Sequence, residues 1–153
     1  MNIRKAENTE KDCNLVFALS NDSIVRANSF STERIEYTNH VNWYKKTLNN
    51  RDILFFLVFD GDDFVGQIRF KRKSGQDEEC VISLSISSPF RGKGIAKNFL
   101  GLGIQELKKS WHEIKEVTAE VKDENSASVK LFESAGFKAV EVGKINIYKF
   151  DIK

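Results

Sequence analysis

The 153-residue chain contains only one proline and two cysteines, and these shortages exclude several architectures. The single proline, Pro89, argues against a proline-rich linker, so we expect one domain over residues 1–153, long enough to bury a core. Cys13 and Cys80 lie far apart, and with only two histidines the chain has no pattern of metal ligands. We therefore expect no metal site and a reduced, cytoplasmic protein.

Long apolar stretches and an excess of one charge are also missing. The longest apolar run covers only Ile53–Phe59, and residues 1–8 lack the apolar core of a signal peptide, so we expect no membrane partner. Lysine and arginine number 24 and aspartate and glutamate 22, and the net charge of +2 is too small to indicate a nucleic-acid partner. The composition, with 41% hydrophobic and 30% charged residues, is that of a globular protein.

The hydrophobic pattern predicts a mixed α/β fold. Ile53–Phe59 is typical of a strand buried on both faces, and the alternating runs 64–70 and 81–88 follow it after short turns. Further strands are predicted over 3–6, 117–121, 137–142 and 144–150, and helices over 10–19, 38–48, 95–110 and 125–135. The order β-α-α-β-β-β-α-β-α-β-β indicates a predominantly antiparallel sheet of six or seven strands with helices on both faces and one parallel pair.

Two local features carry further expectations. The basic run Lys71-Arg72-Lys73 precedes an acidic run and is expected at the solvated tip of a hairpin. Gly101 and Gly103 lie inside the helix predicted over 95–110, where each costs about 1 kcal/mol relative to alanine. We interpret both glycines as sites of close packing against the sheet.

The segment Arg91-Gly92-Lys93-Gly94-Ile95-Ala96 connects the strand that ends at Ser88 to the next helix. Its two glycines lack a Cβ where the backbone has to approach a ligand, and a helix start offers unpaired N–H groups. With Lys97 nearby, this combination indicates an anion site suited to a pyrophosphate. The glycine spacing fits neither a Walker loop nor a dinucleotide fingerprint, and a tight connection with basic side chains is the alternative.

Here the sequence resembles a known family. Arg-x-x-Gly-x-Ala at 91–96, with Leu84-Ser85-Ile86 and Phe90 before it, resembles the acetyl-CoA signature of the GNAT superfamily of N-acetyltransferases. Residues 120–125 and 131–137 resemble the second signature of that family, and the resemblance covers essentially the whole chain. It implies an acetyl-CoA-dependent N-acetyltransferase in which the central parallel strands, 82–87 and 117–122, splay apart.

The resemblance also implies how acetyl-CoA is held. The pantetheine arm would lie between the splayed strands, bonded to backbone groups of one of them, and the glycine turn would hold the pyrophosphate. The residues implied in cofactor binding are Leu84, Ser85, Ile86, Arg91, Gly92, Lys93, Gly94, Ile95, Ala96, Lys97, Asn125, Ser128 and Phe132. For Asn125, a plain helix N-cap is the alternative role.

Glu120 is the candidate general base, since similar family members place a glutamate there and a base is needed to remove a proton from the acceptor ammonium. An ordinary surface glutamate is the alternative. Phe132 departs from the family, because many members carry a tyrosine there that protonates the coenzyme A thiolate. Water, Ser128 or Tyr148 could replace it, the thiolate could leave unprotonated, or the chain could bind the cofactor without catalysis.

The acceptor side is predicted from a weaker local match. Residues 25–30, 40–43 and 66–70 resemble a subgroup that acetylates nucleotide-linked 4-amino-4,6-dideoxy sugars, as in pseudaminic acid pathways. The implied substrate-binding residues are Arg26, Asn28, Phe30, His40, Trp43, Gln67 and Arg69. The basic and amide groups suit phosphate or hydroxyl contacts, and the aromatic rings suit stacking.

Plainer roles stay open for several of these residues. Phe30 and Trp43 could be core anchors, His40 could be polar surface, and Arg69 could pair with a carboxylate. Acetylation of a protein N-terminus or another small amine, and a non-catalytic acyl-CoA-binding module, remain alternative functions. A homodimer is compatible with the sequence.

Overall fold

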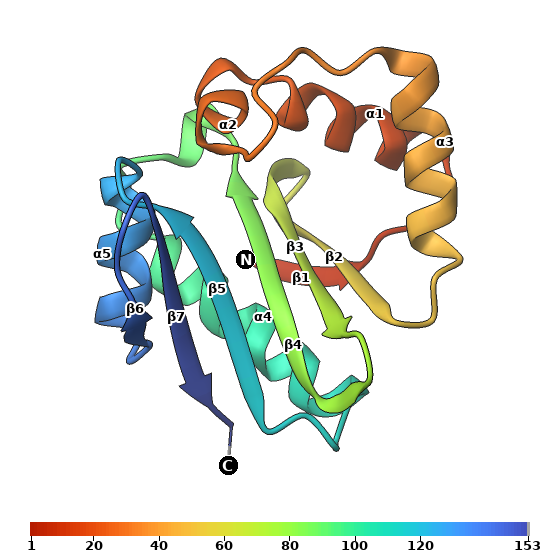
Figure 1. Cartoon of the computed structure of the whole chain (residues 1–153). Coiled ribbons are helices and arrows are strands. Elements are labelled where there is room, and N and C mark those ends of the chain that lie inside the picture. Colours follow the sequence, from red (N-terminus) through yellow and green to blue (C-terminus); the bar gives the residue numbers. More distant parts are fainter. Residues whose placement is uncertain (153) are drawn as a thin grey trace. The chain divides into compact units, whose positions relative to one another are not determined.

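The computed structural model describes residues 1–152 as a mixed α/β fold with seven strands and five α-helices (Figure 1). The strands form one sheet in the order β1-β2-β3-β4-β5-β7-β6. The elements are β1 (Asn2–Lys5), α1 (Glu10–Ser20), α2 (Ser23–Asn28), α3 (Tyr37–Leu48), β2 (Ile53–Asp60), β3 (Asp63–Lys73), β4 (Gln76–Ile86), the 3-10 helix η1 (Ser88–Phe90), α4 (Ala96–Ser110), β5 (Glu116–Lys122), α5 (Ser126–Ser134), β6 (Lys138–Glu141) and β7 (Ile145–Asp151). The predicted fold class is confirmed.

Strand pairing follows the predicted plan of a mainly antiparallel sheet with one parallel pair. β1 pairs antiparallel with β2, and β5 and β6 each pair antiparallel with β7. β4 and β5 pair in parallel, in a register that includes Glu79 with Glu116 and Ile82 with Ala119. Because α4 connects these two strands, they form the strand–helix–strand crossover expected from the sequence.

The chain divides into two compact units. The first unit comprises Met1–Arg69 and Leu84–Ile95, and the second comprises Phe70–Ser83 and the residues from Ala96 onward. Strands β3 and β4 therefore each contribute residues to both units.

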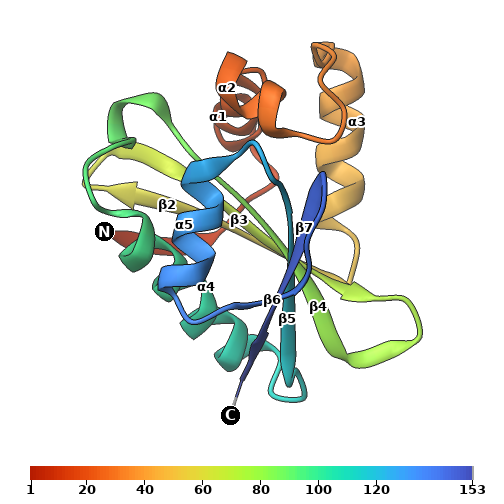
Figure 2. The same ribbon diagram turned by 60° about the vertical axis from the view of Figure 1, so that its left-hand side comes forward.

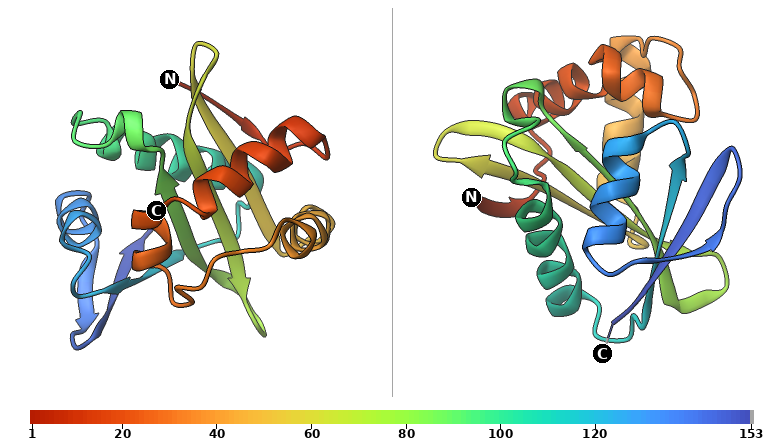
Figure 3. Two further views of the ribbon diagram at one scale, coloured as in Figure 1. Left: turned by 90° about the horizontal axis from the view of Figure 1, so that it is seen from above. Right: turned by 90° about the vertical axis from the view of Figure 1, so that its left-hand side faces the viewer.

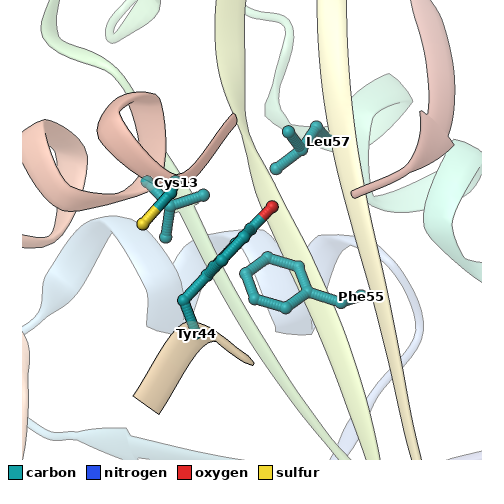
Figure 4. Packing of buried hydrophobic residues seen from close by; sticks show 5 residues of the cluster. Cys13, Tyr44, Phe55 and Leu57 are labelled. Carbon is teal, nitrogen blue, oxygen red and sulfur yellow. The ribbon is translucent and has the colours of Figure 1, made fainter. Parts of the chain in front are cut away.

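The core of the first unit lies between α1, α3 and β2. Thr9 caps α1 by accepting a hydrogen bond from the Asp12 N–H, as predicted. The helix then buries one apolar stripe, in which Cys13 and Val16 pack against Tyr44 of α3 and the β2 residues Phe55 and Leu57 (Figure 4). Helices α2 and α3 both contact α1 in this unit, and Figure 3 shows the connection that runs from α2 to α3.

The core of the second unit lies between its strands and the helices α4 and α5, which lie side by side (Figure 2). Val117, Ala119 and Val121 alternate along β5 and are buried, as expected for the covered face of a strand. Helix α5 ends at Gly136, whose φ of +91° is a left-handed conformation that favours glycine, in agreement with the predicted stop.

Two local expectations are corrected, and one short helix was missed. Helix α2 was not predicted. Arg72 lies within β3 rather than at a hairpin tip, where its guanidinium stacks on Trp111 at 4.0 Å from the ring centroid and pairs with Glu113. A Cβ at Gly101 would meet no atom within 4 Å, so close packing does not explain this glycine.

Candidate active site

The glycine turn, residues 91–95, has the backbone that its sequence suggests. Gly92 and Gly94 have φ values of +69° and +74°, a region that side chains with a Cβ rarely adopt. A Cβ at either glycine would meet no protein atom within 4 Å, and both glycines are exposed. The backbone of the turn therefore faces open space. It continues directly into α4, whose first N–H groups have no partner within the helix.

The basic side chains of this region fall into two groups. Lys93 in the turn and Lys97 in the first turn of α4 are exposed, so both ammonium groups suit an anionic ligand. Arg91 instead donates from Nε to the Ile86 carbonyl and from Nη2 to Asp22 Oδ1, both at 2.9 Å. The turn backbone and Lys93 are therefore open to solvent, while the Arg91 side chain bonds to the protein.

The end of β4 contributes half-buried residues, Leu84, Ser85 and Ile86, to the first unit. The Ser85 hydroxyl oxygen accepts a hydrogen bond of 2.9 Å from Gln67 Nε2. Gln67 is only 4% exposed, and its Oε1 has no hydrogen-bond partner among the described residues. A buried oxygen without a hydrogen-bond partner is costly and is uncommon in folded proteins.

Arg26 belongs to the connection between α1 and α3, residues 21–36, which we call the α1–α3 segment. Its guanidinium donates four hydrogen bonds within the first unit, to the carbonyl oxygens of Ser20, Ser31 and Glu33 and to the Ser29 hydroxyl. These bonds direct the Arg26 guanidinium toward protein groups, while its predicted role in holding a substrate phosphate stays a prediction. The residue fastens the α1–α3 segment onto itself.

The aromatic residues Phe30 and Trp43 of the first unit reach solvent. Phe30 is 60% exposed, so it is not a core anchor, and Asn28 lies half-buried at the end of α2. Trp43 on α3 is 38% exposed, and the Arg69 guanidinium lies 4.8 Å from its ring centroid. Burial lowers the pKa of Arg69 to about 10, which leaves the group charged at neutral pH. The cation–π contact thus places a charged Arg69 beside the partly exposed Trp43 ring.

His40, by contrast, is 1% exposed and lies against Phe17, Trp43 and Tyr44. Its Nε2 is 2.9 Å from the Cys13 carbonyl oxygen, and because a carbonyl only accepts, this nitrogen carries the proton. Burial lowers the pKa of His40, so the ring is neutral at pH 7. This burial rules out the alternative of a polar surface residue, while the predicted contact of His40 with substrate stays a prediction.

Glu120 lies in the second unit with an exposed side chain, on the face of β5 opposite Ala119 and Val121. Its register partner on β7 is Ile147. Thr118, on the same face as Glu120, is 4% exposed, and its hydroxyl has no partner among the described residues. This face of β5 therefore carries an accessible carboxylate two residues from an unsatisfied buried hydroxyl.

The second signature region begins with an N-cap. Asn125 Oδ1 accepts a hydrogen bond of 3.2 Å from the N–H of the half-buried Ser128, which confirms the capping role. Phe132 is buried against Phe137, with ring centroids 4.9 Å apart, and stacks near Tyr148 at 6.4 Å. Tyr148 is 2% exposed, and burial raises the pKa of its hydroxyl. The rings of Phe132 and Tyr148 therefore both belong to the core of the second unit.

Sequence reasoning missed Asp22 and Asn146. Asp22 caps α2 and pairs with Arg91, and the only sequence signal for it was the cap-forming run Asn21-Asp22-Ser23. The buried Asn146 amide donates to Asp123 at 2.8 Å and accepts from the Gly143 N–H, joining the loop after β5 to the turn before β7. Nothing in the local sequence around Asn146 points to that partner.

Within residues 1–152, no three His, Cys, Asp or Glu side chains gather as they would around a metal ion. None of the helices in this range has the length and apolar character needed to cross a bilayer.

Solved structures share this fold over nearly the whole chain. Spermidine N-acetyltransferase from Vibrio cholerae, in complex with CoA and spermine, has a TM-score of 0.84 at 17% identity, covering 98% of this chain and 94% of that chain. Campylobacter jejuni N-acetyltransferase PseH in complex with acetyl coenzyme A has a TM-score of 0.77 at 17% identity, covering 99% and 100%. Ribosomal-protein-alanine N-acetyltransferase from Brucella melitensis has a TM-score of 0.80 at 20% identity, also covering 99% and 100%. At these identities the likeness establishes the fold.

No curated protein matches the sequence. A family model does: the one described as "Acetyltransferase (GNAT) domain" matches residues 1–138, which include the glycine turn and the second signature.

Proposed function

The chain belongs to the acetyltransferase (GNAT) domain family and is an acetyl-CoA-dependent N-acetyltransferase, and from this premise we propose that its acceptor is the 4-amino group of a nucleotide-linked amino-deoxy sugar. The observation that supports acetyl-CoA binding is the glycine turn. Gly92 and Gly94 have left-handed φ values, and their backbone faces open space. The family match includes both units, which supports the prediction of one acetyltransferase domain.

In the proposed complex, backbone N–H groups of residues 92–97 hold the pyrophosphate of acetyl-CoA, and Lys93 and Lys97 neutralise its charge. Backbone groups of Leu84, Ser85 and Ile86 hold the pantetheine arm. Asn125 and Ser128 complete the proposed cofactor contacts from the second signature.

The proposed reaction is a direct acetyl transfer in a ternary complex. The amine nitrogen attacks the thioester carbonyl carbon, a C–N bond forms, and the C–S bond breaks to release the coenzyme A thiolate. Glu120 accepts the proton that the nitrogen loses, directly or through water, a role that its exposed carboxylate permits. Orientation of the two reactants supplies much of the acceleration.

We propose that the thiolate takes its proton from water after leaving. Phe132 has no proton to donate, and the Tyr148 hydroxyl is buried with a raised pKa, which makes it a poor substitute. A thiol pKa of about 8.5 makes coenzyme A a tolerable leaving group without a dedicated acid. Ser128 is the remaining protein candidate, since it is half-buried on α5.

The acceptor proposal rests on the exposed surface of the first unit. Phe30 and Trp43 offer aromatic rings to solvent, and the half-buried Asn28 and Arg69 offer polar groups for hydroxyl or phosphate contacts. The buried Gln67 is proposed to contribute through its unpaired Oε1. His40 and Arg26 are not included, because the protein occupies both side chains.

We also propose a cytoplasmic location.

The same fold supports other acceptors. The similar structures include an enzyme named for spermidine and one named for ribosomal-protein alanine, so a small amine or a protein N-terminus is the second candidate function. A non-catalytic acyl-CoA-binding module is the third candidate, and Phe132 is the feature that favours it.

Release of free thiol from acetyl-CoA, measured with a panel of UDP-linked amino sugars, polyamines and alanine-terminated peptides, separates these functions. We expect release with the amino sugars and none with sugars that carry a hydroxyl in place of the amine. Release with only polyamines or peptides would replace the proposed acceptor. No release with any acceptor, alongside measurable cofactor binding, would indicate the non-catalytic module.

The role of Glu120 gives a separate prediction. Glu120→Gln should lower kcat/KM by about 100-fold or more, the usual contribution of a general base, and remove the acidic limb of its pH profile. Glu141→Gln is the matched control, since Glu141 is an exposed strand glutamate in the same unit and should leave the profile unchanged. An unaltered pH profile in the Glu120 variant would exclude it as the base.

A further inference from the structure

Arg91 opens the glycine turn, yet its side chain is held by protein groups. Its Nη2 lies 2.9 Å from Asp22 Oδ1, and its Nε lies 2.9 Å from the Ile86 carbonyl oxygen. The Arg91 and Asp22 side chains are 25% and 24% exposed, respectively, so this ion pair is largely shielded from water. One guanidinium therefore joins the end of β4, the glycine turn and the start of α2, all within the first unit.

Asp22 is the junction on the other side. The same Oδ1 that pairs with Arg91 accepts hydrogen bonds from the N–H groups of Ile24 and Val25, at 3.0 and 3.2 Å, and so caps α2. Partial burial opposes ionisation, but the bonds from Arg91 and from these backbone groups hold the pKa of Asp22 below its ordinary value. Asp22 is thus charged at neutral pH and serves the helix and the turn together.

The α1–α3 segment is cross-linked by hydrogen bonds between its ends and within its middle. The Asn21 side chain makes two hydrogen bonds of 2.8 Å with the backbone of Ile35, which closes the segment into a loop. Arg26 then ties the interior of that loop to Ser31 and Glu33. Asp22 and the exposed Phe30 therefore belong to the same closed loop.

We propose that Arg91 is a positioning residue that couples the glycine turn to the α1–α3 segment, so that coenzyme A bound at the turn holds this segment in place. The role of the segment in acceptor binding rests on the function proposed above. The coupling itself does not, because it is a property of the turn, the ion pair and the closed loop. In this arrangement Arg91 acts through Asp22, and the phosphates are left to the turn backbone, Lys93 and Lys97.

Hydrogen exchange with coenzyme A alone tests the coupling without any acceptor. In the unaltered protein, coenzyme A should slow amide exchange in residues 84–95 and also in residues 21–35, the latter by about fivefold or more, the lower end of typical coupling between sites. Asp22→Ser keeps a good N-cap for α2 but is too short to reach Arg91. In this variant, protection of 84–95 should persist while the effect on 21–35 disappears.

Two further variants sharpen the test. Arg91→Met should uncouple the segment in the same way, and combining it with Asp22→Ser should add little, because both remove one interaction. Lys93→Met, in the same turn, should weaken coenzyme A binding but keep the protection of 21–35 at saturating ligand. With acceptor present, the Asp22 variant should raise the acceptor KM more than it lowers kcat.

The outcomes are distinguishable. If coenzyme A protects 84–95 but not 21–35 in the unaltered protein, or if Asp22→Ser retains the protection of 21–35, the coupling is wrong while the proposed function stands. If coenzyme A protects neither segment and does not bind, the proposed cofactor site itself is wrong.

Discussion

At the scale of single residues, backbone conformation explains the glycine turn better than side-chain packing does. Gly92 and Gly94 adopt left-handed φ values, yet a Cβ at either would touch nothing within 4 Å. The protein itself therefore needs glycine here only for its φ. The absence of a Cβ on an exposed backbone then becomes useful for a ligand that contacts N–H groups directly.

Gly94→Ala should accordingly cost about 1–2 kcal/mol through its left-handed backbone, and should weaken coenzyme A binding at least tenfold. Gly101→Ala is the matched control, because Gly101 lies in α4 with no atom within 4 Å of an added Cβ. It should raise the unfolding free energy by up to about 1 kcal/mol and leave binding unchanged. Calorimetric titration with coenzyme A and urea unfolding measure both effects. Equal binding by the two alanine variants would contradict the assigned site.

The same scale shows what the sequence could and could not predict about the site. The glycine turn was predictable because its signal is local: glycines and lysines follow a strand and precede a helix. The surroundings of Arg26 and His40 were not predictable, because the Arg26 bonds depend on how the α1–α3 segment folds and His40 is buried against residues distant in the sequence. The Cys13 carbonyl that occupies His40 lies 27 positions away in the sequence, and no local pattern reveals it.

At the scale of elements, the packing of α3 favours the neutral form of His40. The ring is buried beside Phe17, Trp43 and Tyr44, and burial lowers its pKa, with the nearby Arg69 charge acting in the same direction. Because the folded pKa is depressed, the unfolded chain binds the extra proton more readily. The stability gained from neutral His40 is present above the unfolded pKa and is lost as pH falls below it.

We therefore predict that the unfolding free energy falls as pH drops below about 6.5, by up to about 1.4 kcal/mol per pH unit. His40→Gln retains an N–H donor for Cys13 but cannot take up a proton in this range. Its stability should be lower at neutral pH and should change less with acidification. Urea unfolding across this range gives both slopes, and parallel slopes would show that His40 does not titrate as described.

Element boundaries follow from local chemistry where caps and turns are strong. Thr9 and Gly136 begin and end helices as predicted, and β2 and β3 meet at Gly61, whose φ is +60°. Helix α2 escaped prediction because its six residues show no apolar stripe and none of them is buried. Its stability comes from the Asp22 cap and the Arg26 bonds, which depend on residues outside the helix.

At the scale of the whole molecule, β3 and β4 supply residues to both compact units. The prediction of a single domain therefore implies that the units unfold together. The two tryptophans allow a direct test, because Trp43 lies in the first unit and Trp111 in the second. Trp43→Phe and Trp111→Phe each leave one reporter.

We predict coincident urea transitions, in midpoint and in slope, for the fluorescence of each single-tryptophan variant and for its circular dichroism. Coincidence between the two variants is judged after correction for their separately measured stabilities. Two resolved transitions within one variant would show that the units are independent domains.

The proposed function requires transfer of an acetyl group from acetyl-CoA to the amine of a nucleotide-linked sugar. The most direct measurement is the mass of a UDP-linked 4-amino-4,6-dideoxy sugar after incubation with the enzyme and acetyl-CoA. We predict that the sugar nucleotide gains one acetyl group, and that this gain is lost without enzyme and strongly reduced with Glu120→Gln. An unchanged sugar nucleotide, from a protein that binds coenzyme A and acetylates a polyamine or peptide instead, would contradict the proposed acceptor.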